Sequence, residues 1–139
     1  MRLREHKAQV RGGFTLMELM VVVMILVVLA GIAVPTYMYY AEEAKIKAAF
    51  ANCDTIAKAA QAYQVENGDF PASLVVLTQP QPNGKRPLLE PRFIIDPWGH
   101  EYSYAAQGQH GAMYGKPDVY TTDPSGRVIG NWQIKAGEG

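Results

Sequence analysis

The chain has 139 residues, 48% hydrophobic and 19% charged, which is the composition of a single ordinary folded domain. Its 13 basic residues balance its 13 acidic residues, and this neutrality excludes a strong overall field for binding nucleic acid. Cys53 is the single cysteine, so no intramolecular disulfide can form, and we expect a small buried thiol on a helix.

Residues 14–34 form a run of 21 residues that contains a single charge, Glu18. A membrane helix needs about 20 apolar residues, so we expect this run to span a bilayer. The residues before it are basic and should stay on the cytoplasmic side. These residues are Arg2, Arg4, Lys7 and Arg11, opposed by Glu5. The chain after Val34 would then be exported, and without residues 1–13 it would be mildly acidic.

Glu18 stands out because a carboxylate inside a bilayer costs several kcal/mol and usually has a function. It lies four residues after Phe14, which in a helix places both on one face, one turn apart. A cut before Phe14 would create an α-amino group that could neutralise Glu18, within one chain or between neighbours. The alternative is a glutamate at the membrane interface of an ordinary anchor.

Three interpretations compete for residues 1–34. The first is an uncleaved anchor, and the second is an ordinary secretory signal with a small-residue site at Gly31, Ile32 and Ala33. The third is a leader that is cut on the cytoplasmic side after a glycine. The apolar run is longer than the 7–15 or so residues of a usual signal and contains a charge, which argues against the second.

Residues 11–35, RGGFTLMELMVVVMILVVLAGIAVP, resemble the N-terminus of type IV pilins and type II secretion pseudopilins. The resemblance implies that a prepilin peptidase cuts after Gly13 and methylates the new first residue, Phe14. It also implies that Glu18 pairs with the N-terminus of a neighbouring subunit during assembly. Pro35 ends the membrane part, where loss of a hydrogen bond should kink or locally open the helix.

Residues 35–67 should continue as an exported helical stem that ends at Asn67 and Gly68, a typical helix stop. A helix over 14–67 would be roughly 80 Å long. Two stripes recur at helical spacing, and we expect most of these residues to pack beneath the domain that follows. The first is Ala41, Ala44, Ala48, Ala51, Ala59 and Ala62, and the second is Ile46, Phe50, Cys53, Ala57 and Ala60.

Residues 68–139 are richer in glycine and proline, and their apolar runs are shorter. Strand-like patterns occur at Ile94-Ile95 with Tyr102 and Tyr104, at 119–121 and at 128–129. A turn at 123–126, DPSG, separates the last two. We therefore expect an α+β fold in which three short antiparallel strands lie on the long N-terminal helix.

Four blocks in this region resemble the major pseudopilin of type II secretion. They are DPWG (Asp96, Pro97, Trp98, Gly99) followed by EYSY, then GQHG at 108–111, then DVYTTDPSG at 118–126, and then IGNW (Ile129, Gly130, Asn131, Trp132). Trp98 can plug the core, and we expect both tryptophans to serve packing rather than ligand binding.

Members of that family usually carry a longer acidic loop before IGNW, and the loop binds calcium. In this chain Arg127 and Val128 directly precede Ile129, and only Asp118 and Asp123 lie nearby. Calcium takes six or more oxygen ligands, several of them charged, so we expect no metal or other cofactor here. Our hypothesis is that Arg127 and the tight 123–126 turn replace the ion.

Enzymatic chemistry is not expected. His6 would leave with the leader. His100 and His110 lie in turn-rich stretches that contain no cysteine and no cluster of carboxylates, although Glu101 follows His100 directly. The sequence contains no HExxH, GxSxG or phosphate-binding motif.

We divide the chain into a leader (1–13), a transmembrane and assembly helix (14–34), an exported stem (35–67) and a globular β domain (68–139). The resemblance implies a structural subunit of a periplasmic pseudopilus in a type II secretion system, which polymerises and drives export of folded proteins across the outer membrane. It would be a single-pass inner-membrane protein with a cytoplasmic N-terminus and a periplasmic C-terminal domain.

The expected partners are other copies of the chain, prepilin peptidase, an inner-membrane assembly platform, minor pseudopilins and the lipid bilayer, but no nucleic acid. Two alternatives remain: a type IV pilus subunit, and a secreted or anchored binding domain with an ordinary signal.

Overall fold

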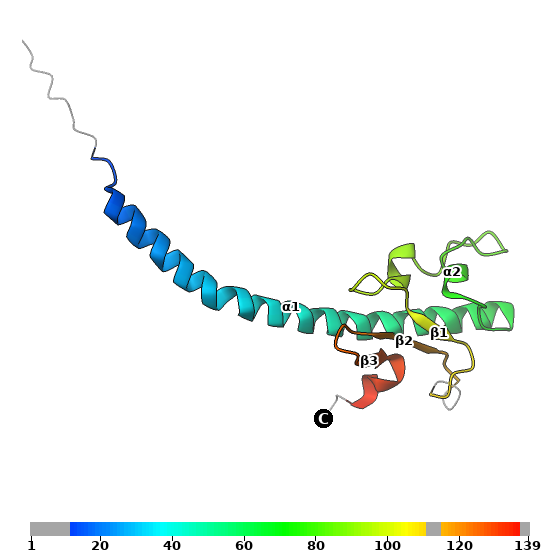
Figure 1. Cartoon of the computed structure of the whole chain (residues 1–139). Coiled ribbons are helices and arrows are strands. Elements are labelled where there is room, and N and C mark those ends of the chain that lie inside the picture. The colour runs from blue at the N-terminus through cyan, green and yellow to red at the C-terminus, as the bar shows by residue number, and fades with distance from the viewer. Residues whose placement is uncertain (1–11, 111–114, 137–139) are drawn as a thin grey trace, which may run out of the picture. The chain divides into compact units, whose positions relative to one another are not determined.

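The computed structural model describes residues 12–110 and 115–136, so most of the expected leader lies outside the described residues. Figure 1 shows the elements in chain order. They are α1 (Leu16–Asn67), α2 (Leu74–Leu77), the 3₁₀ helix η1 (Pro91–Ile94), β1 (Ser103–Ala105), β2 (Asp118–Thr122), β3 (Val128–Gly130) and the 3₁₀ helix η3 (Asn131–Ala136). The chain divides into two units, which meet between Tyr39 and Tyr40.

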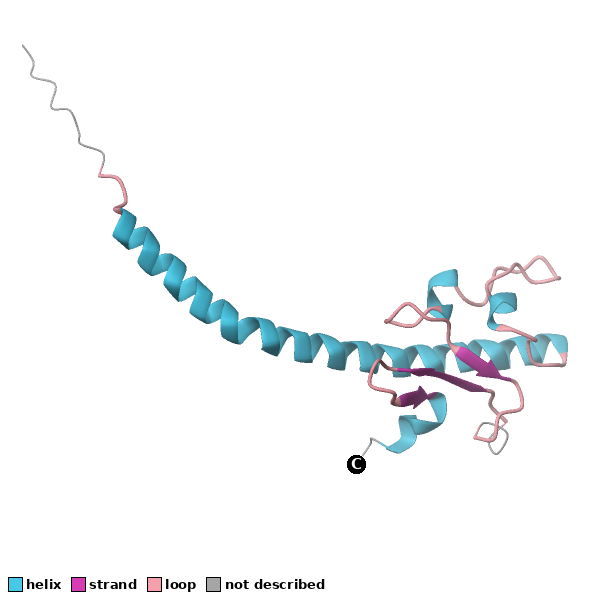
Figure 2. Ribbon diagram, viewed as in Figure 1, coloured by secondary structure: helices cyan, strands magenta, loops and turns pink. Residues whose placement is uncertain are grey.

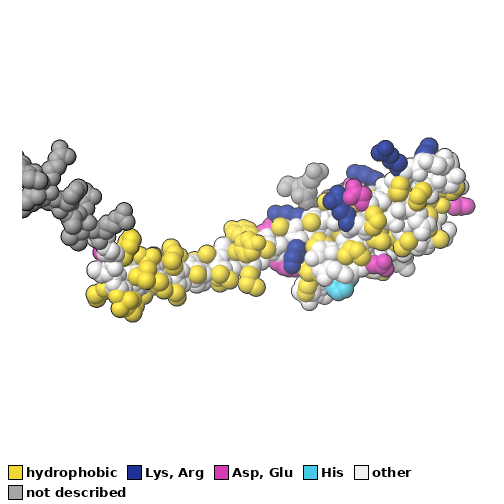
Figure 3. All heavy atoms as spheres, turned by 90° about the horizontal axis from the view of Figure 1, so that it is seen from above, with side chains coloured by type: hydrophobic (Ala, Val, Ile, Leu, Met, Phe, Trp, Pro, Cys, Tyr) yellow, Lys and Arg dark blue, Asp and Glu magenta, His cyan; other side chains and the backbone are white. Residues whose placement is uncertain are grey.

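In the first unit, residues 16–39 are helical and none of their side chains is buried. Figure 3 shows hydrophobic side chains over this stretch, whereas most charged side chains lie on the second unit. The helix is long and apolar enough to cross a membrane, and none of its most apolar stretch is buried inside the protein. Such a surface is stable only against lipid or against other apolar surfaces.

The C-terminal end of α1 follows the expected stop signal. The Gly68 N–H donates to the Gln64 carbonyl at 2.8 Å, and Gly68 has φ +89°, a left-handed conformation that glycine adopts without strain. The helix therefore ends where the chain must turn back to build the domain.

The second unit contains one antiparallel sheet in the order β1-β2-β3, which confirms the expected three-stranded α+β fold. Ser103 pairs with Tyr120, and Thr121 pairs with Ile129. In Figure 2 the three strands lie along the part of α1 that belongs to this unit. The region around Ile94 and Ile95 was expected to be a strand, and this prediction is wrong.

Ile94 ends η1 instead, and Ile95 forms only an isolated bridge with Glu101. Pro91 is at the start of η1, where its fixed φ and missing N–H suit a helical turn. The turn takes up the residues that a longer strand would need. The two segments are joined by the bridge and by two backbone hydrogen bonds, from the Tyr102 N–H to the Ile94 carbonyl at 3.0 Å and from the Asp96 N–H to the His100 carbonyl at 2.7 Å.

The core of this unit lies between α1 and the segments that cross it. Its buried members are Cys53, Ile56, Ala57, Ala60, Leu74, Leu77, Leu89, Ile94, Tyr102 and Val119. Small residues on α1 allow Leu77 and Val119, both fully buried, to approach the helix closely. The second expected stripe is thus the buried one: Cys53, Ala57 and Ala60 are buried, and Ile46 and Phe50 are half-buried.

The alanine stripe does not pack beneath the domain, contrary to expectation. Ala44, Ala48, Ala51 and Ala62 are exposed, and only Ala59 packs against the core. The two stripes lie on different faces of one helix, and a small sheet with its loops covers a single face. Periodicity identifies the helix but does not tell which of two apolar faces is covered.

Cys53 is a fully buried free thiol, as predicted, and its S–H donates to the Ile129 carbonyl at 3.7 Å. Burial raises the pKa of this thiol to about 12, so it carries almost no thiolate at neutral pH. We expect a maleimide to modify Cys53 slowly in the folded protein and rapidly in denaturant. Mass spectrometry of timed samples measures both rates, and equal rates would contradict the burial.

Candidate functional site

The N-terminus of α1 is capped by a reciprocal pair of hydrogen bonds. The Thr15 N–H donates to Glu18 Oε2 at 2.9 Å, and the Glu18 N–H donates to Thr15 Oγ1 at 3.2 Å. With Leu16 as the first helical residue, Thr15 is the N-cap and Glu18 the third residue of a capping box. The Glu18 carboxylate also lies at the positive end of the helix dipole. The sequence Thr-x-x-Glu already carried this signal, which the sequence analysis missed.

Phe14 lies just outside the helix, so it does not share a helical face with Glu18 as expected. Residues 12–15 have no regular secondary structure, and the Phe14 side chain is 92% exposed. Gly12 and Gly13 are exposed as well. The expected cleavage position therefore lies in accessible backbone, next to a carboxylate that the same chain already binds.

Pro35 lies inside α1, and helical structure continues on both sides of it. Proline has no N–H, so the Gly31 carbonyl has no helical donor at this position. One turn nearby is reinforced, because Thr36 Oγ1 donates to the Ile32 carbonyl at 3.0 Å. The kink at Pro35 stays a prediction.

The DPWG block is held together by the side chain of Asp96, which is fully buried. Asp96 Oδ1 accepts the N–H groups of Trp98 at 3.0 Å and His100 at 2.8 Å, and Oδ2 accepts the hydroxyl of Thr121 on β2. Burial alone would raise the pKa of this carboxyl, but these hydrogen bonds outweigh it and hold the pKa below its ordinary value.

Trp98 connects the same turn to α1. Its Nε1–H donates to Glu42 Oε1 at 2.6 Å, and the side chain is half-buried rather than a plug of the core. Gly99 has φ +94°, which a residue with a side chain rarely adopts. Pro97 and Gly99 therefore shape a turn that carries Trp98 onto the helix.

The IGNW block spans the end of β3 and the start of η3, and it holds the start of β2 in place. Asn131 Oδ1 accepts the Val119 N–H at 3.0 Å, and its Nδ2 donates to the Pro117 carbonyl at 2.8 Å. Ile129 is fully buried. A Cβ on Gly130 would lie 2.5 Å from the Trp132 ring, so only glycine lets the ring pack there. All four residues thus make packing or hydrogen-bond contacts within the domain.

The histidines have carboxylate neighbours that the sequence did not reveal. His100 Nδ1 lies 3.6 Å from Asp96 Oδ2, and His110 Nδ1 lies 3.4 Å from Asp118 Oδ2. The His110 ring also stacks on Trp132, with 4.2 Å between ring centroids. Within residues 12–110 and 115–136, no three histidine, cysteine or acidic side chains gather in a way that could hold a metal ion.

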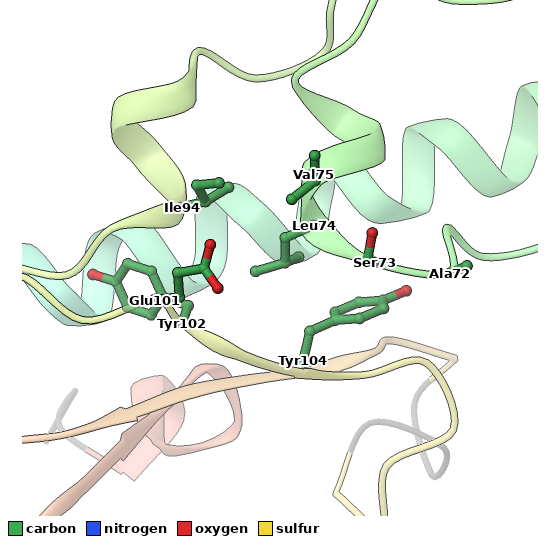
Figure 4. Close-up of a pocket in the computed structure, with 8 residues that line it drawn as sticks. All are labelled: Ala72, Ser73, Leu74, Val75, Ile94, Glu101, Tyr102 and Tyr104. Atoms are coloured by element: carbon green, nitrogen blue, oxygen red, sulfur yellow. The ribbon is translucent and has the colours of Figure 1, made fainter.

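A cleft of about 200 Å³ lies between the start of α2, the end of η1 and the start of β1 (Figure 4). It is lined by Ala72, Ser73, Leu74, Val75, Ile94, Glu101, Tyr102 and Tyr104. Burial raises the pKa of Tyr104 to about 12, so its hydroxyl stays protonated. Glu101 is the one acidic residue among the lining side chains and no histidine is present, so the cleft lacks the acid–base pair of a hydrolytic site.

Comparisons with known proteins agree over nearly the whole chain. The family described as type II secretion system (T2SS), protein G, matches residues 36–132, and the prokaryotic N-terminal methylation motif matches residues 9–34. The chain belongs to the type II secretion system protein G family.

Curated relatives cover almost the same length. The type II secretion system core protein G of Pseudomonas aeruginosa is 34% identical over 88% of this chain and 95% of its own. The corresponding protein of Vibrio cholerae is 32% identical over 93% of this chain and 97% of its own. The fold matches a crystal structure of the major pseudopilin from enterohaemorrhagic Escherichia coli, with a TM-score of 0.54, 22% identity, and coverage of 70% of this chain and 90% of that chain.

These findings confirm that the chain is a major pseudopilin of a type II secretion system. They also confirm that it belongs to a structural family and is not an enzyme. A pseudopilin with this methylation motif is implied to be processed by prepilin peptidase and to assemble into a filament. The capping box of Thr15 and Glu18 lies inside the matched motif, so the geometry at the start of α1 belongs to the part of the chain that is processed and assembled.

Proposed function

We propose that this pseudopilin is cut after Gly13, methylated at the new N-terminus of Phe14, and polymerised through α1 into a periplasmic filament. The filament drives export of folded proteins across the outer membrane. The observation that supports the proposal is the exposure of the N-terminal part of α1, where every large hydrophobic side chain from Leu16 to Val34 is at least half exposed. A soluble monomer could not keep such a surface in water.

The precursor spans the inner membrane once in this proposal. The basic residues of 1–13 hold the N-terminus in the cytoplasm, and the domain that follows α1 is periplasmic. Lipid covers the apolar side chains before assembly, and neighbouring copies cover them in the filament. An inner-membrane assembly platform and minor pseudopilins are the further partners, since a single-pass subunit has no machinery to extract itself from the bilayer.

Glu18 sets the register between subunits in this proposal. Its carboxylate is bound by its own Thr15 in the single chain, and after the cut the α-amino group of Phe14 on a neighbour competes for it. A charged partner binds a carboxylate more strongly than a neutral N–H does, and more so in a surrounding of low dielectric. Assembly would thus exchange an internal cap for an intersubunit ion pair.

The test is the intact mass and first residue of the protein extracted from its native membrane. We expect a chain that starts at N-methylated Phe14. A chain starting at Val34 would indicate an ordinary signal cut after Ala33, although Gly31, Ile32 and Ala33 lie inside α1. A chain starting at Met1 would indicate an unprocessed anchor. Either of these two results would contradict the proposed processing.

A further inference from the structure

The turn between β2 and β3 is closed around one carboxylate. Asp123 Oδ1 accepts three hydrogen bonds: from the Ser125 N–H at 3.0 Å, from the Ser125 hydroxyl at 2.6 Å and from the Arg127 N–H at 2.9 Å. Asp123 Oδ2 accepts a fourth from Arg127 Nε at 3.2 Å. The Asp123 side chain is 4% exposed, so these donors, and not water, satisfy it.

Backbone hydrogen bonds close the same turn. The Asp123 N–H donates to the Arg127 carbonyl at 3.0 Å, and the Gly126 N–H donates to the Asp123 carbonyl at 2.9 Å. Gly126 has φ +86°, the left-handed conformation that this tight reversal requires. The turn is therefore complete within five residues, and its charge is balanced by its own arginine.

This arrangement does not fit a calcium ion, which needs six to eight oxygen ligands at about 2.3–2.6 Å. Asp123 is the single acidic residue of the turn, and both of its oxygens are in use. Asp118 is at the opposite end of β2, five residues and roughly 16 Å away at about 3.3 Å per residue, so the two cannot share an ion. Asp118 Oδ2 instead accepts the His110 N–H at 3.2 Å.

The groove beside the turn offers no free carboxylate either. It has a volume of about 310 Å³ and is lined by Glu42, Ile46, Asp123, Pro124, Ser125 and Arg127. Glu42 Oε1 accepts the Trp98 Nε1–H, and Glu42 Oε2 lies 3.4 Å from Lys45 Nζ. Arg127 already brings a positive charge to this groove, which disfavours a second cation.

We propose that the Arg127 side chain takes the place of a bound cation in the β2–β3 turn, so that this domain keeps its sheet without calcium. The guanidinium provides the positive charge, and the Ser125 hydroxyl a hydrogen bond, that an acidic loop would obtain from the ion. The proposal concerns the stability of the subunit and does not depend on filament assembly.

Acid, rather than a chelator, is then the condition that opens the turn. The Ser125 hydroxyl and the Arg127 N–H hold the pKa of Asp123 below its ordinary value. A carboxyl whose pKa is lower in the folded chain than in the unfolded chain stabilises the fold above the unfolded value. The contribution is lost as the pH falls through the folded value, so the turn should weaken only in strong acid.

The experiment uses the full chain in detergent and follows thermal unfolding by near-UV circular dichroism, with a calcium chelator and with millimolar calcium. We expect the same melting temperature in both conditions. A filled site would raise it by roughly 5 °C or more. Arg127→Met, which keeps an unbranched apolar stem and removes the guanidinium and its charge, should lower the melting temperature by about 3–6 °C, and calcium should not restore it.

Arg92→Met is the matched control. Arg92 pairs with Glu90 at 2.8 Å on the surface, with both side chains largely exposed, and its loss should change the melting temperature by less than about 2 °C. A rise in the melting temperature of the unchanged protein with calcium would overturn the proposal. So would an Arg127→Met protein that melts no lower than the Arg92→Met protein.

Discussion

A chain carrying Glu18→Ala will be cut and will stay in the membrane, but it will not assemble into filaments. In the proposed filament, the substitution leaves the α-amino group of a neighbour's Phe14 without a carboxylate among apolar side chains. Removing one member of a buried ion pair costs roughly 3–5 kcal/mol, which is at least about a hundredfold in each subunit contact. Filaments sheared from cells that express equal amounts of each variant, quantified by immunoblot, provide the measurement.

Glu18→Gln is the matched control because the structure gives Glu18 two roles. A glutamine oxygen can still accept the Thr15 N–H, so the capping box survives without the charge. If the ion pair drives assembly, the Gln variant should fail as the Ala variant does. Normal filament yield from Glu18→Ala would refute the pairing role, and failure of Ala alone would assign Glu18 to the cap.

Asp96→Ala should be the most damaging single substitution in the globular domain. It leaves two backbone N–H groups and the Thr121 hydroxyl without their acceptor at a site that excludes water. Each stranded buried group costs about 1–3 kcal/mol, so we expect a loss of about 3–5 kcal/mol and a fall in melting temperature of roughly 10 °C or more. Urea unfolding followed by tryptophan fluorescence measures the free energy.

Asp69→Ala is the control, since Asp69 is an exposed aspartate in the loop after α1. Its free energy of unfolding should change by less than about 0.5 kcal/mol. The pH dependence adds an independent check. The pKa of Asp96 is lower in the folded chain, so its stabilisation is present above the ordinary carboxyl pKa of about 3.9 and is lost in stronger acid. Asp96→Asn should flatten that acid limb, and an unchanged limb would contradict the assignment.

The long helix could be predicted because its signals are local. The apolar run, the helical spacing and the Asn67-Gly68 stop each depend on residues within a few turns of one another. The capping box was equally local, since Thr15 and Glu18 are three residues apart, and the Thr-x-x-Glu pattern was sufficient to find it.

The contacts of the globular domain could not be predicted in this way. Asp96 meets Thr121 across 25 residues, and Trp98 meets Glu42 across 56 residues. Such pairs exist only after the sheet has been placed on α1, and hydrophobic patterning does not encode that placement. The same limit explains the alanine face, since a single sequence cannot tell which of two apolar faces the sheet covers.

The start of α1 at Leu16 has a consequence for the enzyme that processes the precursor. The proposed scissile bond, between Gly13 and Phe14, lies in residues that have no regular structure. A peptidase acting on a helical bond must first unwind a turn, whereas here the substrate is already open to it. Both members of the capping box lie on the mature side, so the product keeps the helix end of the precursor and has no refolding step before assembly.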